Sequence, residues 1–313
     1  MRAVSEKNIA KLLYLLFFMW PVLGLFYIYK YINTYSGKLF YVLFFALIGF
    51  TYHIGNTGYD TYAYYTWFQE QSALSYSEYF SEIIRRFSVR SLKPEIFQYS
   101  IEFWISRVTD NASVYFCALS TILGIALVKN LGLLTNMYNE NKTFYGLLFI
   151  VFLIVLVSPL RIASFRHYLA GLVFVYSAFQ VIVNGNKKYI IGIFSTVLIH
   201  IGFSIGIILF LLYYLIGNRF PVYLILLGAS YFLSESLITL MIENSDFFSG
   251  DFKTKAAAYS YEGFIKETTK SQQQGLFLLR ILVEWTRYFF FIFTTFWYFK
   301  IKISIKALQD CIF

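Results

Sequence analysis

The segment 158–174, SPLRIASFRHYLAGLVF, places two arginines and a histidine between apolar runs. A guanidinium keeps its positive charge and forks across phosphate oxygens, and a helix N-terminus adds positive potential. Pro159 ends one predicted helix, so Arg161, Arg166 and His167 lie at or just inside the start of the next. We predict that these side chains face a pyrophosphate group. The alternative is that both arginines snorkel to lipid phosphates.

His200 interrupts the apolar run YIIGIFSTVLIHIGFSIGIILF. A histidine in such a run is costly unless it meets a partner or a water-filled cavity. As a catalytic group it would hold a phosphate or move a proton near neutral pH. The alternative is a structural histidine that bonds a backbone carbonyl at a helix break.

The stretch GNTGYDTYAYYTWF, residues 55–68, presents Asp60 among tyrosines that include Tyr62 and Tyr64. Tyrosine faces pack on sugar rings, and a carboxylate bonds hydroxyls or acts as a base. Glu95 is a second candidate carboxylate. The alternative for the tyrosines is an interfacial aromatic belt.

Further along the chain, Arg280, Glu284 and Arg287 fall on one face of a predicted helix. Pairing within the helix explains these charges in part, and a wet cavity would explain why they are tolerated. The histidines lack the spacing of a zinc site. Cys117 and Cys311 lie in regions too different to form a disulfide framework. We expect no metal and no cofactor.

The composition decides the class of protein. Of 313 residues, 58% are hydrophobic and only 14% are charged, which excludes an ordinary soluble domain and indicates an all-α, polytopic membrane protein. The net charge of +9 fits lysine-rich cytoplasmic loops better than nucleic-acid binding, so the expected surroundings are the lipid bilayer.

Apolar runs long enough for about nine transmembrane or half-membrane helices lie at 9–29, 39–54, 112–128, 143–160, 167–183, 189–199, 201–216, 220–242 and 275–299. The two runs that meet at His200 are either one bent span or a broken pair. Counted as two, they place the basic segment 184–188 and the C-terminal tail inside, and the polar loops 55–111 and 244–274 outside. This topology puts the basic N-terminus outside, against the usual rule. The segment EIFQYSIEFWISRV within the first loop predicts an interfacial helix. The whole chain, 1–313, is predicted to form a single polytopic domain.

In their order and spacing, several segments resemble the EpsG family of Wzy-like exopolysaccharide polymerases. The matching segments are TGYDTYAYY, KPEIFQYSIEFW, AAAYSYEGF around Tyr259, and FRHYLAGLVFVYSAFQVIVNGNKKYIIGIFSTVLIHIGF. In the last segment, an arginine two residues before Leu-Ala is followed by a lysine-rich loop and a span that ends in histidine. Arg166 and His200 match those two positions.

The resemblance implies a polymerase that joins undecaprenyl-pyrophosphate-linked oligosaccharide repeat units on the outer face of the bacterial cytoplasmic membrane. Its partners would include a flippase and a chain-length regulator of the same pathway. Arg166, His200, Asp60 and Glu95 would be catalytic, with the other arginines, His167 and the tyrosines binding substrate. An O-antigen ligase, a flippase or exporter of the lipid-linked unit, and an inert scaffold are the alternatives.

Overall fold

The computed structural model describes residues 6–226, apart from 29–30, 53, 55–59, 88–94, 141–143, 158, 218 and 220. The regular elements among these residues are all helices. Backbone contacts divide the chain into two compact units, Met1–Phe220 and Pro221–Phe313. Of the second unit only residues 221–226 are described, and they are helical. The predicted spans 220–242 and 275–299 and the loop 244–274 therefore fall largely or wholly outside the described residues, and the single-domain organisation stays a prediction.

The N-terminal apolar run forms two helices where the sequence predicted one span. Helix α1, Glu6–Met19, ends just before Trp20, and α2, Pro21–Ile28, begins at the proline. A proline at the first helical position is well tolerated, whereas inside a helix it would clash with the preceding turn. Helix α3, Tyr35–Phe50, follows after a cap in which the Thr34 hydroxyl accepts a hydrogen bond from the Gly37 amide.

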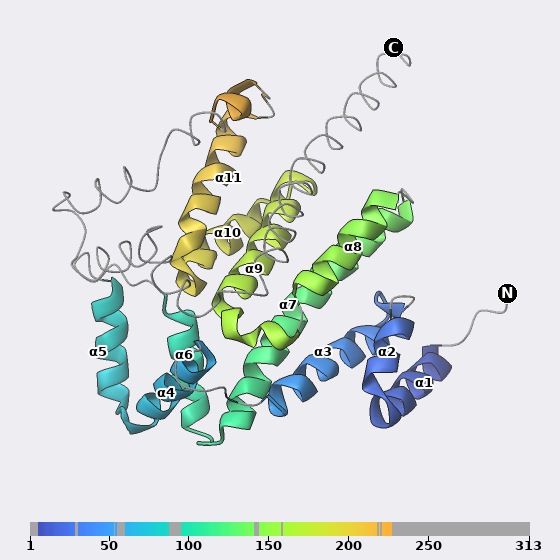
Figure 1. Ribbon diagram of the computed structural model, residues 1–313. Coiled ribbons are helices and arrows are strands. Elements are labelled where there is room, and N and C mark those ends of the chain that lie inside the picture. Colours follow the sequence, from blue (N-terminus) through green and yellow to red (C-terminus); the bar gives the residue numbers. More distant parts are fainter. Residues whose placement is uncertain are drawn as a thin grey trace, which may run out of the picture. The chain divides into compact units, whose positions relative to one another are not determined.

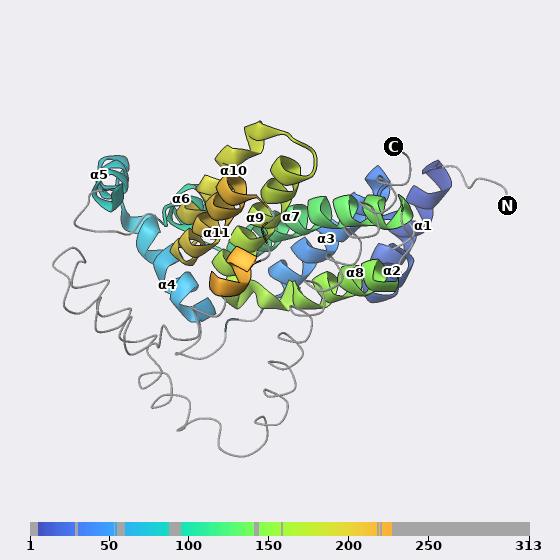
Figure 2. The same ribbon diagram turned by 90° about the horizontal axis from the view of Figure 1, so that it is seen from above.

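The described residues of the polar segment 55–111 form three helices, α4 (Asp60–Ala73), α5 (Tyr76–Phe87) and α6 (Phe97–Ser106). Helix α6 confirms that this segment is helical, and its predicted position at the membrane interface stays a prediction. Its face with Gln98, Glu102 and Phe103 is buried within the protein, and the helix packs against α4. Figures 1 and 2 show α4, α5 and α6 at one side of the molecule, and α1 and α2 at the other.

Helix α7, Ala112–Glu140, is twelve residues longer than the predicted span 112–128. It is followed by α8 (Phe144–Leu156), the short 3₁₀ helix η2 (Pro159–Ser164) and α9 (Phe165–Ile182). The polar pair Lys129 and Asn130 suggested a loop. Asn130 instead stays inside the helix because its side-chain amide donates to Ala126 O at 2.9 Å and to Leu172 O of α9 at 3.1 Å.

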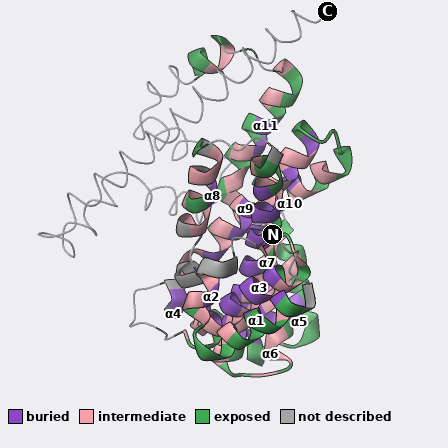
Figure 3. Ribbon diagram, turned by 90° about the vertical axis from the view of Figure 1, so that its right-hand side faces the viewer, coloured by how far each residue is buried: buried purple, intermediate pink, exposed green. Residues whose placement is uncertain are grey.

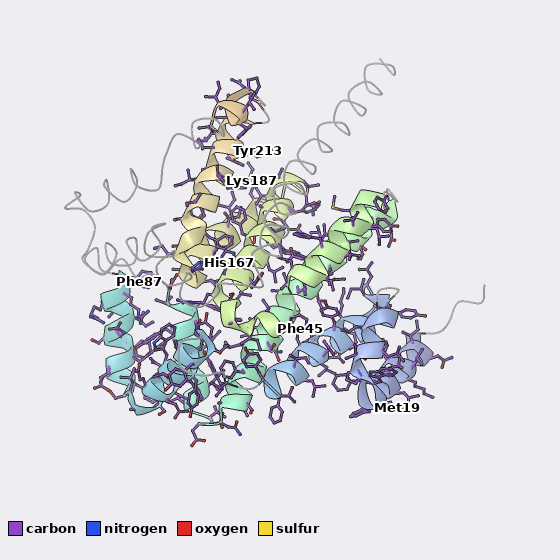
Figure 4. All side chains as sticks on the ribbon, viewed as in Figure 1. Met19, Phe45, Phe87, His167, Lys187 and Tyr213 are labelled. Carbon is purple, nitrogen blue, oxygen red and sulfur yellow. The ribbon has the colours of Figure 1, made fainter. Side chains whose placement is uncertain are left out.

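The two short runs around His200 are separate helices, as the broken-pair interpretation predicted. The 3₁₀ helix η3 (Lys187–Tyr189) leads into α10 (Ile190–Ile199), and η4 (Ile201–Phe203) leads into α11 (Ser204–Ile216). Between them His200 is extended, with φ −153° and ψ 117°. Figure 4 shows His167 near the end of α9 that faces α6, and Lys187 and Tyr213 toward the opposite ends of α9, α10 and α11.

The core lies where α3 packs on α7, α7 on α9, and α9 on α10. Figure 3 shows buried residues gathered on these inner helices, while α11 is largely exposed. The largest side chains that are almost fully buried are aromatic: Tyr64, Tyr115, Phe45, Phe68, Phe103, Phe116 and Phe165.

Two helical stretches, Ala112–Asn139 and Ile162–Ile182, are long and apolar enough to cross a membrane. Three shorter apolar helices, Asn8–Met19, Tyr35–Phe50 and Ile201–Ile216, accompany them. These helices favour a membrane protein, while the full set of about nine predicted spans stays a prediction. Helix α10, with ten residues, covers about 15 Å, roughly half of a bilayer core.

Candidate functional site

The carboxylate of Glu95 joins two residues that the sequence singled out separately. Its Oε2 accepts a hydrogen bond from Arg166 Nη1 at 2.7 Å. Its Oε1 lies 2.9 Å from His200 Nδ1 and accepts from the Ile201 backbone amide, also at 2.9 Å. Glu95, Arg166 and His200, here called the Glu95 cluster, therefore meet although 71 and 105 residues separate Glu95 from the other two.

Each member of the Glu95 cluster is held at the end of an element. Glu95 lies just before α6, and Arg86 of α5 donates to its backbone carbonyl at 3.3 Å. Arg166 is the second residue of α9, and His200 lies between α10 and η4. The cluster thus forms where the start of α9 and the break between α10 and α11 meet the polar segment.

The electrostatic setting of Glu95 favours its ionised form. Burial raises the pKa of its carboxyl, but the hydrogen bond from His200, the charge of Arg166 and the hydrogen bond from the Ile201 amide outweigh burial and lower the pKa to about 2. A carboxylate with so low a pKa is a poor base near neutral pH, so the catalytic role of Glu95 as a proton acceptor stays a prediction that this setting does not favour. The hydrogen bonds of Glu95 suit a residue that positions Arg166 and His200.

Arg166 lies beside two aromatic rings of α4. Its guanidinium carbon is 5.7 Å from the ring centre of Tyr64 and 5.6 Å from that of Trp67. Tyr64 is only 2% exposed, so its ring is covered by the protein in this structure, and the sugar stacking predicted for it stays a prediction. Trp67, which sequence analysis passed over, is 38% exposed.

The ring of His200 has a defined orientation. An ionised Glu95 can only accept, so Nδ1 carries the proton of this hydrogen bond and Nε2 is the ring nitrogen that points away from Glu95. Gly202 lies against this nitrogen, since a Cβ atom there would come within 3.2 Å of Nε2. The exposed ring of His167 stands edge-on to that of His200, with 5.6 Å between centres.

A second carboxyl, Glu102, is buried close by. Its Oε1 accepts hydrogen bonds from Gln98 Nε2 at 2.7 Å and from Tyr115 OH at 2.9 Å. Burial raises the pKa of Glu102 to about 7, against the opposing effects of these two bonds and the charges of Arg166 and Arg86. Sequence analysis missed this group. Gln98 and Glu102, four residues apart among apolar residues, were the available signal.

The remaining predicted site residues are described only in part or not at all. Asp60 begins α4 and Arg161 lies in η2, but neither side chain is among those described. Tyr62 lies on α4 and is 39% exposed. The last group, Tyr259, Arg280 and Arg287, falls outside the described residues.

No family model matches the chain, and neither does any curated protein or solved structure. The resemblance to Wzy-like polymerases therefore remains a prediction that rests on the quoted segments. Within the part of the chain that the structure describes, no three His, Cys, Asp or Glu side chains are arranged to hold a metal ion.

Proposed function

We propose that this chain is a Wzy-like polymerase that joins undecaprenyl-pyrophosphate-linked oligosaccharide units on the outer face of the bacterial cytoplasmic membrane. The observation that carries the proposal is the Glu95 cluster. Glu95, Arg166 and His200 come from two of the segments on which the resemblance rests, and they converge within hydrogen-bonding distance. A cation, an oriented imidazole and a fixed carboxylate supply what transfer of a sugar from a phosphate requires.

In the proposed reaction, a hydroxyl oxygen of the acceptor glycan attacks the anomeric carbon of the donor glycan. The bond between that carbon and the phosphate oxygen breaks, and undecaprenyl pyrophosphate leaves with the electron pair. The hydroxyl proton passes to His200 Nε2, which Glu95 keeps as an acceptor by taking the Nδ1–H bond. Glu95 itself touches neither the proton nor the sugar, so it is a positioning residue.

Arg166 would stabilise the negative charge that develops on the leaving pyrophosphate. Its side chain is 26% exposed, so a ligand can reach it, while the 2.7 Å bond to Glu95 fixes its direction. A fixed cation needs no rearrangement when charge develops, which is the condition for electrostatic stabilisation of a transition state. The start of α9 adds the partial positive charge of a helix N-terminus.

The proposal is tested by replacing Arg166. Each variant is expressed at a matched level in a strain that lacks the gene. Arg166→Ala should abolish the glycan ladder. Arg166→Lys keeps the charge but loses the fork, and we expect it to lower polymerisation by about 10²–10³, as for other lost transition-state contacts. The same pair of changes at Arg85, a 72% exposed arginine of α5, is the control and should leave the ladder intact. Normal ladders from Arg166→Lys would show that Arg166 is an anchor.

The same glycans separate a polymerase from a ligase. A strain without polymerase activity still attaches single repeat units to the final acceptor, whereas a strain without ligase activity attaches none. We therefore expect single units without a ladder from Arg166→Ala. Complete loss of attached units would favour the ligase alternative.

A further inference from the structure

Trp67 presents an exposed aromatic ring beside Arg166 of the Glu95 cluster. It follows Tyr64 by three residues on α4, and the two rings lie 5.7 Å apart at 40°. Both are within 6 Å of the Arg166 guanidinium carbon, but Tyr64 is 2% exposed and Trp67 is 38% exposed. Tyr64 therefore packs beside Arg166 in the protein interior, and Trp67 presents a ring that a ligand can contact.

We infer that Trp67 is a binding platform for a sugar ring, adjacent to the phosphate position at Arg166. The inference rests on the proposed function, which puts a glycan linked to pyrophosphate at this place. In such a donor the first sugar is bonded directly to the phosphate. A ring in contact with the guanidinium that holds the phosphate is therefore within reach of that sugar.

The chemistry of tryptophan suits this ligand. The C–H face of a pyranose packs on the flat, electron-rich indole, and the sugar hydroxyls stay free for hydrogen bonds. Arg166 next to Trp67 adds a cation for the phosphate, so the pair matches both parts of a sugar phosphate.

A tryptophan near a membrane can also serve only as an interfacial anchor. Helix α4 is not one of the apolar helices, and its exposed Glu70 lies three residues beyond Trp67. Anchoring needs an apolar side chain of sufficient size, whereas stacking needs an aromatic face. Aliphatic and aromatic replacements therefore separate the two roles.

The test uses the full chain in detergent micelles and a free oligosaccharide of the host's repeat unit, without lipid or phosphate. Trp67→Leu should weaken binding about five- to tenfold, the range expected for an aromatic contact, while Trp67→Phe stays within about threefold of the wild type. Trp67→Met provides a second aliphatic variant should Trp67→Leu fold poorly. Trp104→Leu is the matched control, because Trp104 is 51% exposed but packs against Tyr76 and Tyr79 on α5.

Unchanged affinity of the folded aliphatic variants, equal weakening by Trp104→Leu, or no binding to the wild type would overturn the inference. Inorganic pyrophosphate is the second probe: its affinity should fall in Arg166→Ala and stay unchanged in Trp67→Leu. If pyrophosphate binding needs Arg166 but sugar binding ignores Trp67, the platform is wrong and the proposed function stands. If Arg166 variants bind pyrophosphate and polymerise normally, the proposed function itself fails.

Discussion

Replacing Glu95 by glutamine should destabilise the protein in a way that depends on pH. The variant keeps the shape of the side chain but removes the charge that Arg166, His200 and the Ile201 amide share. Burial opposes the ionised form, yet these three groups lower the pKa of Glu95 from 4.5 to about 2. That difference corresponds to about 3 kcal/mol of folding free energy, at about 1.4 kcal/mol for each tenfold change in acidity.

The sign of the pH dependence follows from proton binding. The unfolded chain binds the Glu95 proton more tightly than the folded chain, so the ionised carboxylate stabilises the fold fully above about pH 4.5. This stabilisation is lost as the pH falls toward 2. The difference in unfolding free energy between the wild type and Glu95→Gln should therefore be near 3 kcal/mol at pH 7 and clearly smaller at pH 3.

Equilibrium unfolding in mixed micelles of a mild detergent and SDS, at pH 7 and pH 3, measures this difference. Glu70→Gln, which removes an exposed carboxylate of α4, is the control and should change little at either pH. A double variant, Glu95→Gln with Arg166→Met, should lose less than the sum of the two single changes because the residues are in direct contact. Equal destabilisation at both pH values, or none at pH 7, would refute the assignment of an ionised Glu95.

Three further outcomes are expected. Because burial raises the pKa of Glu102 to about 7, the wild type should lose up to about 3 kcal/mol of stability as the pH rises from 4.5 through 7, and Glu102→Gln, measured in the same micelles, should flatten this decline. Gly202→Ala would place a methyl group about 3.2 Å from His200 Nε2, so the ladder should shorten while the amount of protein in the membrane stays constant; a full ladder would show that Nε2 is not used. An impermeant thiol reagent applied to intact cells should label a cysteine at Tyr62 and not one at Lys187, and the reverse pattern would invert the proposed topology.

The length of the apolar runs predicted most of the helices in the described part of the chain. The ends of these helices depend on contacts with other segments, which the runs themselves do not show. Helix α7 continues past Lys129 because Asn130 donates to a carbonyl of its own helix and to Leu172 O of α9. A local reading treats such a polar pair as the start of a loop. The break at Pro21 and the break at His200 were predictable, since a proline and an isolated histidine each stand out in an apolar run.

The site could be predicted as a set of residues but not as an arrangement. Arg166 and His200 could be singled out because a charged group or an imidazole in an apolar segment is costly unless it has a partner or a function. Their common partner was not, since the pairing of Glu95 with residues 71 and 105 positions away depends on how α6, α9 and α10 pack. That packing also decides the role of Glu95, because the same carboxyl would be a base if its neighbours raised its pKa.

The roles of the aromatic residues on α4 show the same limit. Tyr62, Tyr64 and Trp67 lie on one polar helix whose sequence gives no clear apolar face. Only the packing of α4 against α6, α7 and η2 distinguishes the buried Tyr64 from the exposed Trp67. The tyrosine-rich segment drew attention to this region, but it did not indicate which aromatic ring is exposed beside Arg166.

The helix break at His200 connects stability to the proposed chemistry. A break in an apolar segment leaves backbone groups without partners, which is costly away from water. Glu95 Oε1 accepts from the Ile201 amide just past the break and from His200 Nδ1 beside it. The Glu95 carboxylate therefore has two roles. It orients the His200 ring, and it accepts the hydrogen bond of the Ile201 amide beside the helix break. A continuous helix through residues 190–216 would bond the Ile201 amide internally and leave Glu95 Oε1 without this donor. The extended conformation of His200 therefore provides Glu95 with two of the contacts that lower the pKa of its carboxyl.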